Sequence, residues 1–420
     1  MKASNVLKIA LPRLRHEDTE ARLEAARLWN RLVKLHRWFR RRHRPWPSAS
    51  QFEQHFKGRF HLHSQTVQAL IQRFFANIET AHTNRKNGDR NARYPHKLKR
   101  FVPVIWKGQA VRKGQGRIIL PMGRGRDPIE YRLPATPEGR IAQVELGFRE
   151  LRITLSCEVA QPDRLPGIAA ADLGLINLAV VSDGEQSIGI VGRGLRSIMQ
   201  WQSKKKAALS SLLSRCKRGS RRWRKLKRTQ HKARRHRDNI QRNLLHHAAN
   251  AVVGYCEQRE IGTLVVGDIT EISRGKRRKM SRRTNQENSN NPLGQFKQYL
   301  DYKLKRIGCC RETQNEAYTT KTCPVCGRRH KPAGRLYRCI CGFVGIRDEV
   351  GAVNQLNKYL HGGDIIPGTV LPTGKVKYLR PAKLRSGVVP LTPGKWLDMS
   401  LVAAGTAHNG EMPCVAHAAA

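Results

Sequence analysis

Acidic residues and long apolar runs are both scarce in this chain of 420 residues. Only 31 residues are Asp or Glu against 80 Lys or Arg, which leaves a formal net charge of +49. A chain with so large an excess repels itself unless a polyanion neutralises it. No apolar run approaches the ~20 residues that cross a bilayer. The expected partner is therefore nucleic acid, because its phosphates release counterions when Lys or Arg binds them.

The sequence also lacks a secretory signal and a disulfide framework. The N-terminal residues contain no apolar segment of sufficient length, and charged residues follow at once. Of the ten cysteines, four have the spacing of metal ligands and the others show no pattern of pairing. We therefore expect a cytoplasmic protein.

The apolar periodicity changes along the chain. Residues 15–94 carry two amphipathic helical patterns, and residues 95–165 alternate with the period of β-strands. From 168 onward strands and helices alternate, which indicates an α/β domain. The segment 271–291 is basic and polar, and we expect a mobile loop there. The tail at 361–420 has weak periodicity, so we predict that it is disordered and assign it no function.

One segment concentrates the positive charge. Residues 204–237 hold sixteen Lys or Arg and no acidic residue. A solvated helical face normally mixes both signs, so the pattern favours an arm that follows a phosphate backbone. The side chains predicted to bind nucleic acid are Lys204, Lys205, Lys206, Arg221, Arg222, Arg224, Lys225, Arg234 and Arg235.

Four cysteines form the most specific local motif. Cys323 and Cys326 are followed, after twelve residues, by Cys339 and Cys341. Two pairs of thiolates on tight turns are what a tetrahedral Zn²⁺ requires, although the second pair is one residue closer than usual. The pattern predicts a closed structural zinc site, with four unligated thiols as the alternative.

Two aspartates point to a second metal site. Asp172 lies in the apolar strand pattern AAADLGL, where an unpaired charge is costly and calls for a cation or dense hydrogen bonding. Asp348 lies near the start of an amphipathic helix, where the helix dipole stabilises a carboxylate. Alone, it could be only a capping residue. Together the two carboxylates could hold a pair of Mg²⁺ ions for phosphodiester hydrolysis.

The order of these motifs resembles one known family. The segment DLGLINLA from Asp172 resembles the first RuvC motif of the TnpB (OrfB) proteins of insertion sequences. The segments CPVCG, YRCICGF and RDEVGAVN resemble that family's zinc ribbon running into its third RuvC motif. NPLGQFKQYLDYKLKRIG is similar to the helix before the ribbon, and RYPHKLKRFVPVIW to the segment entering a wedge-like barrel. The resemblance covers roughly residues 1–358 and extends to the type V CRISPR effectors.

The resemblance implies an RNA-guided DNA endonuclease of an insertion sequence, of a kind often labelled transposase. Its implied partners are a guide RNA from the transposon end and double-stranded target DNA in a prokaryotic nucleoid. Its implied cofactors are structural Zn²⁺ and catalytic Mg²⁺. Two alternatives stay open: a nuclease-inactive, RNA-guided DNA-binding repressor, and an RNA-binding zinc-ribbon protein without DNA targeting.

The implied fold class is multidomain α/β. It combines an RNase H-like (RuvC) nuclease domain carrying an inserted zinc ribbon with a small β-barrel and an α-helical recognition lobe. The predicted boundaries are 1–14 and 95–165 for the barrel, 15–94 for the lobe, 166–317 and 343–360 for the nuclease domain, and 318–342 for the ribbon.

The second RuvC motif departs from the family pattern. The family usually has Glu at the end of this strand, whereas the segment GTLVVGDI has Asp268 there. Asp268 could still bind metal, although its carboxylate reaches ~1.5 Å less far than that of Glu. Alternatively, Glu316 supplies the acid from just before the ribbon, as in branches of the family that look rearranged. The third possibility is an inactive site, in which Asp172 and Asp348 persist without catalysis.

Overall fold

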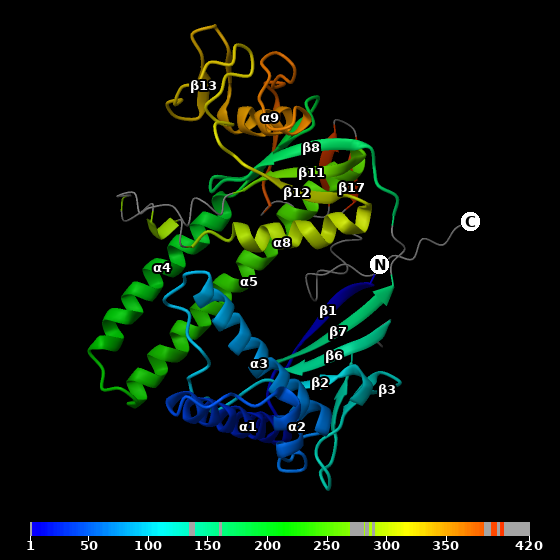
Figure 1. Ribbon diagram of the computed structural model, residues 1–420, viewed down its shortest axis with the longest axis vertical. Coiled ribbons are helices and arrows are strands. Elements are labelled where there is room, and N and C mark those ends of the chain that lie inside the picture. The colour runs from blue at the N-terminus through cyan, green and yellow to red at the C-terminus, as the bar shows by residue number, and fades with distance from the viewer. Residues whose placement is uncertain are drawn as a thin grey trace. The chain divides into compact units, whose positions relative to one another are not determined.

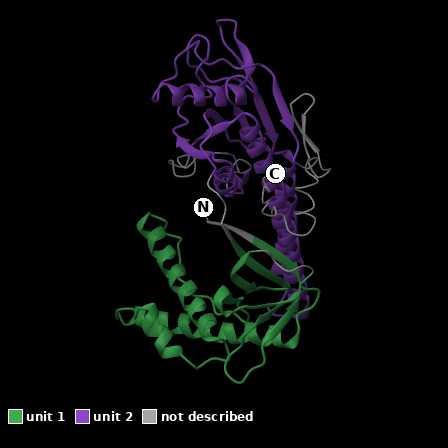
Figure 2. Cartoon of the chain, turned by 90° about the vertical axis from the view of Figure 1, so that its right-hand side faces the viewer, with its two compact units in different colours: residues 1–159, 405–420 green, residues 160–404 purple. Residues whose placement is uncertain are grey.

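The computed structural model divides the chain into two compact units, each described here by itself (Figure 2). Unit 1 comprises Met1–Val159 with Gly405–Ala420, and unit 2 comprises Ala160–Ala404. The structure describes residues 2–133, 139–158, 162–268, 281, 285–287, 290–381, 388–392 and 395–398. Most of the predicted mobile loop 271–291 and the end of the predicted tail lie outside these residues. Among the described residues, no helix is long and apolar enough to cross a membrane.

Unit 1 contains two antiparallel sheets. In the four-stranded sheet the order is β1-β7-β6-β2, and in the three-stranded sheet it is β3-β4-β5. The chain leaves the first sheet after β1 and returns to it at β2, as the predicted split of the barrel into 1–14 and 95–165 requires. The strands are β1 (Lys2–Ala10), β2 (Val104–Lys107), β3 (Arg112–Gly114), β4 (Arg117–Leu120), β5 (Ile129–Arg132), β6 (Arg140–Leu146) and β7 (Glu150–Glu158).

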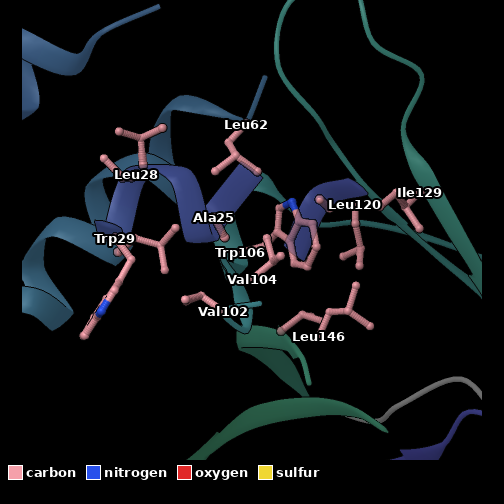
Figure 3. Packing of buried hydrophobic residues seen from close by; sticks show 14 of the residues in the cluster. Ala25, Leu28, Trp29, Leu62, Val102, Val104, Trp106, Leu120, Ile129 and Leu146 are labelled. Atoms are coloured by element: carbon pink, nitrogen blue, oxygen red, sulfur yellow. The ribbon is translucent and has the colours of Figure 1, made fainter. Parts of the chain in front are cut away.

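Three helices fill the excursion between β1 and β2: α1 (His16–Arg41), α2 (Ala49–Phe56) and α3 (Ser64–Lys86). Their apolar faces share one core with the strands of this unit. Trp29 and the fully buried Trp106 are part of this core (Figure 3). Trp29 packs edge-on against Phe74, and Trp106 donates its indole N–H to the carbonyl oxygen of Pro121 at 2.8 Å. The lobe and barrel of unit 1 are thus joined by common hydrophobic burial.

Unit 2 is built on a six-stranded mixed sheet of order β12-β11-β8-β9-β10-β15 (Figure 1). The hairpin strands β8, β9 and β10 are antiparallel, while β11 runs parallel to both β8 and β12. This is the RuvC-like arrangement predicted from the sequence, and the fold class is confirmed. The strands are β8 (Gly167–Asp172), β9 (Asn177–Ser182), β10 (Ser187–Val191), β11 (Ile261–Gly267), β12 (Cys310–Gln314) and β15 (Val376–Leu379).

Helices cover both faces of this sheet. Ala169, Ala171 and Leu264 face the core that includes α5 and α8, whereas Ala170 and Val265 face α9. Because side chains alternate along a strand, every second residue of β8 and β11 points toward α9. Other elements that the structure describes in this unit are α4 (Arg193–Ser214), α5 (Arg221–Gln258), α8 (Leu293–Leu304), the 3-10 helix η2 (Lys305–Ile307), α9 (Arg347–Leu360), and the short strands β13 (Leu336–Arg338), β14 (Val344–Ile346), β16 (Val388–Thr392) and β17 (Lys395–Asp398).

The start of the predicted tail is ordered. β15 pairs in parallel with β10, with Gly189 opposite Tyr378. The prediction of a disordered segment from 361 is therefore wrong for this strand. Its four residues carry too little periodicity to be recognised, and the strand is stabilised by pairing with a distant edge strand instead.

Candidate active site

Asp172 is the last residue of β8 and points toward α9. Its side chain follows the alternation of Ala170, which faces that helix. A Cβ placed on Gly351 of α9 would lie 3.1 Å from both Cγ and Oδ2 of Asp172. Gly351 therefore leaves the space in which the Asp172 carboxylate lies against the helix.

Asp348 lies in the first turn of α9, three residues before Gly351. Positions three apart lie on the same face of a helix, so Asp348 and Gly351 both face Asp172. The side chain of Asn177, buried at the start of β9, donates a hydrogen bond to Oδ2 of Asp348 at 2.7 Å. Asn177 is the last residue of the DLGLIN motif, but no role was predicted for it from the sequence. A polar residue at the start of an apolar strand could have indicated one.

Glu316 follows the end of β12 by two residues. Gln314 of β12 lies opposite Gly267, the last residue of β11. A Cβ on Gly267 would lie 1.9 Å from Oε1 and 2.1 Å from Cγ of Glu316, so the Glu316 side chain occupies the space over this glycine. Its Oε1 is buried and has no hydrogen-bond partner among the described residues.

The charges of Asp348 and Glu316 both act on the carboxylate of Asp172. The pKa of Asp172 is raised well above its ordinary value by burial first, then by the negative charges of Asp348 and Glu316, while Arg347 opposes the shift. The pKa of Glu316 is raised by burial and by Asp268, and Lys297 lowers it. The charges that act on Asp172 thus come from two distant segments of the sequence, the first turn of α9 and the turn after β12.

Asp268 interacts electrostatically with Glu316 and Lys297. It directly follows Gly267, the last residue of β11, and its backbone N–H donates to the carbonyl oxygen of Gln314 at 2.7 Å. Its charge acts on Glu316 and on Lys297 of α8, but it is not among the groups that shift Asp172. Lys297 donates to the carbonyl oxygen of Gly267 at 2.7 Å, and burial lowers the pKa of this lysine.

Two buried polar residues of α9 fix the surrounding loops. Asn354 donates to the carbonyl oxygens of Thr319 at 2.7 Å and Thr322 at 2.8 Å, and so holds the turn that follows Glu316. Glu349 is fully buried and accepts hydrogen bonds from Ser187 on β10 and from Thr373. Neither role was predicted, because both depend on contacts between distant segments.

The four predicted zinc ligands converge. The Sγ atoms of Cys323 and Cys341 lie 3.7 Å apart, and those of Cys326 and Cys339 lie 3.6 Å apart. A tetrahedral ion with Zn–S bonds of about 2.3 Å needs S···S edges of about 3.8 Å, so the donor set fits zinc. Among the described residues, this is the only group of ligand atoms that all lie within 4.8 Å of one another.

Turns and a small hairpin shape this cluster. Gly327 and Gly342 directly follow a cysteine of each pair and adopt positive φ values of 72° and 88°. Strands β13 and β14 pair across the second turn, and the buried Tyr337 donates to the carbonyl oxygen of Lys321 at 2.9 Å. The CxC pair therefore contributes to the cluster despite its short spacing.

The predicted nucleic-acid-binding residues lie on two helices. Lys204, Lys205 and Lys206 are exposed on α4, and the other six are exposed on α5. The buried residues of α5 begin only at Leu245, and before it the side chains of this helix are exposed or half-buried. Arg234 also forms an ion pair with Asp238 at 3.7 Å. The remaining exposed charge suits contact with phosphates.

Comparisons with known proteins match both halves of unit 2. Residues 154–273 match the OrfB_IS605 model, described as a probable transposase, and residues 294–355 match the Cas12f1-like TNB domain. Residues 154–273 are thus similar to the OrfB (TnpB) transposases, and residues 294–355 are similar to the Cas12f1-like TNB domain. The resemblance inferred from the motifs is thereby confirmed. No curated protein sequence matches the chain.

Solved structures support the same fold. A cryo-EM structure of a Cas12f1–sgRNA–target DNA complex is similar with a TM-score of 0.55 and 14% identity, covering 81% of this chain and 82% of that one. A CRISPR-Cas12f ternary complex (TM-score 0.37, 14% identity, 85% and 82% covered) and the mini-RNA-guided endonuclease CRISPR-Cas_phi3 (0.41, 11%, 87% and 94%) match too weakly to add to this. At these identities the likeness concerns the fold.

Proposed function

We propose that this chain is an RNA-guided DNA endonuclease whose site consists of Asp172, Glu316 and Asp348. The observation that carries the proposal is the electrostatic coupling of the buried Asp172 to the other two acids. Three carboxylates held together by the fold are unfavourable unless cations compensate them. The named structural relative was solved with sgRNA and target DNA, which supports the same substrates for this chain.

The donor set fits a pair of Mg²⁺ ions. All three groups are carboxylates, the ligands that hard cations prefer, and Oε1 of Glu316 is buried without a partner among the described residues. The three acids do not all lie within 4.8 Å of one another, whereas the cysteines do.

The chain's own residues would perform distinct tasks. Asp172, Glu316 and Asp348 would hold the metal ions, which supply an activated water and stabilise the leaving oxygen in a hydrolysis without covalent intermediate. Asn177 would keep Asp348 in one rotamer through its hydrogen bond to Oδ2. Lys297 would offset the charge shared by Glu316 and Asp268.

Strand geometry favours Glu316 over Asp268 as the second-motif acid. Gly267 shares the α9 face of the sheet with Asp172, and the Glu316 side chain lies over that glycine. We therefore propose that Asp268 is a remnant outside the metal site. The four-cysteine cluster would hold a structural Zn²⁺, and α4 and α5 would follow the backbone of the guide–target duplex by charge and shape.

Cleavage of a target plasmid tests the proposal. RNA that copurifies with the chain would be sequenced to define the guide, and the plasmid would carry its target beside a randomised flanking sequence. With Mg²⁺, wild-type protein is expected to cut, and Asp172→Ala and Asp348→Ala are expected to bind the same DNA without cutting it. Guide-dependent DNA binding without cleavage by the wild type at any flanking sequence would instead identify a repressor.

A further inference from the structure

The segment after α9 returns to the edge of the unit 2 sheet, beyond both family matches, of which the second ends at residue 355. β15 lies beside β10 with Gly189 opposite Tyr378. Ile188 and Ile190 face the core that contains α5, so Gly189 and its partner Tyr378 lie on the opposite face, the one that carries α9 and Asp172.

Hydrogen bonds to the buried Glu349 hold the segment that leads into β15. Oε1 of Glu349 accepts hydrogen bonds from the backbone N–H of Thr373 at 3.1 Å, from its hydroxyl at 2.7 Å and from the hydroxyl of Ser187 at 2.9 Å. Glu349 is fully buried and directly follows Asp348. The position of β15 is thereby coupled to the first turn of α9, where Asp348 lies.

The ring of Tyr378 lies over Gly189 on the face of the sheet that carries α9. A Cβ on Gly189 would lie 2.6 Å from Cδ1 and Cε1 of Tyr378, so the ring rests on the bare backbone of that glycine. The residue is nevertheless 44% exposed, whereas the next residue, Leu379, is 5% exposed and supplies the core contact of the strand. Among the described residues, the Tyr378 hydroxyl has no hydrogen-bond partner.

The charges near this ring have both signs. Burial raises the pKa of Tyr378 above its ordinary value, and the negative charges of Asp348 and Glu349 raise it further. The positive charge of Arg335 lowers it. Arg335 is exposed, and its carbonyl oxygen accepts the backbone N–H of Arg347 at 2.9 Å, which places it at the start of α9. An exposed guanidinium at the start of α9 and an aromatic ring thus both lie on the α9 side of the sheet, the side toward which Asp172 points.

We propose that Tyr378 and Arg335 form a subsite for one unpaired nucleotide of the strand that enters the carboxylate site. The ring would stack on the base, whatever its identity, and the guanidinium would hold a phosphate. This inference rests on the proposed function, and it assigns to β15 the task of positioning the substrate strand.

Photochemical crosslinking tests the subsite without relying on cleavage. Full-length Asp172→Asn protein, which is expected to leave DNA intact, would be irradiated with a single-stranded oligonucleotide containing 5-iododeoxyuridine. Crosslinked peptides would be mapped by mass spectrometry. We expect a crosslink at Tyr378 that is lost in Tyr378→Ala and kept in Tyr378→Phe. Crosslinks confined to α4 and α5 would overturn the proposal.

Cleavage kinetics provide the second measurement. In otherwise wild-type protein, Tyr378→Ala is expected to slow single-turnover cleavage roughly 5- to 150-fold, the range for loss of one base–aromatic stack. Tyr378→Phe keeps the ring and is expected to cleave at nearly the wild-type rate. Lys377→Ala, one residue earlier on the other side of the strand, is the matched control with little expected effect. Thermal unfolding of each variant checks that β15 stays in place.

The two proposals fail separately. Cleavage by the wild type that is unchanged in Tyr378→Ala, with no crosslink at Tyr378, would remove the subsite and leave the nuclease. A crosslink at Tyr378 in a wild-type protein that never cleaves would remove the nuclease and leave the subsite.

Discussion

Adding one methyl group to Gly267 should inactivate the site without touching an acid. A Cβ at this position would lie 1.9 Å from Oε1, 2.1 Å from Cγ and 2.3 Å from Cδ of Glu316. Ordinary contacts between non-bonded heavy atoms begin near 3.5 Å, so the Glu316 carboxylate must move by about 1.5 Å or more. Catalytic groups need placement within about 0.5 Å, and a misplacement of 1 Å can cost about 100-fold in rate.

We therefore expect Gly267→Ala to reduce single-turnover cleavage of a guided target at least about 100-fold. The φ of Gly267 is not positive, so alanine can adopt its backbone conformation and the sheet should persist. Binding of guide RNA and the unfolding temperature are measured beside the rate. Unchanged values for both would assign the loss to the displaced carboxylate.

Two variants sharpen this test. Gly294→Ala in α8 is the matched control, because a Cβ there would meet nothing within 4 Å. It should cleave at the wild-type rate. Asp268→Asn separates the two candidate acids. Full activity in Gly267→Ala combined with inactivity in Asp268→Asn would refute the placement of Glu316 in the metal site.

Three further outcomes are expected. Elemental analysis should find one Zn²⁺ per wild-type chain and less in Cys326→Ser, whose unfolding temperature should fall because the metal stabilises a ribbon with little core. With Zn²⁺ retained and Mg²⁺ omitted, Asp172→Asn should melt above the wild type at about pH 7–8, and this gain should vanish toward about pH 4. The raised pKa of Asp172 means that its ionisation destabilises the folded state as pH rises above the ordinary carboxyl value. Replacing Lys204, Lys205 and Lys206 by alanine should lower the slope of log Kd against log salt by up to about 2–3, which titrations at several salt concentrations would measure.

Local chemistry made part of this site predictable. Asp172 stood out because an acid inside an apolar strand needs compensation, and the cysteine pairs stood out because few other patterns bring four thiols together. Both signals depend on residues close in sequence. The positive segment 204–237 was recognisable for the same reason, since its composition alone excludes a mixed-sign solvated face.

Other parts depend on strand register, which the sequence does not encode locally. Whether Glu316 or Asp268 faces Asp172 follows from the pairing of Gly267 with Gln314 and from the alternation along β11. A shift of one residue would exchange the faces. The sequence could therefore name both candidates without choosing between them. β15 was missed because its partner strand precedes it by almost two hundred residues, and four residues carry no useful period.

The distribution of charge separates the binding of nucleic acid from its cleavage. A net charge of +49 and the exposed residues of α4 and α5 can hold a polyanion without help. The proposed site has the opposite sign, because Asp172, Glu316 and Asp348 together repel a phosphodiester. Divalent cations invert that local field, since a bound ion outweighs the side chains around it. Binding of nucleic acid should therefore depend on the helices and on salt, whereas approach of the scissile phosphate should depend on the metal ions and on the nucleotides held beside them.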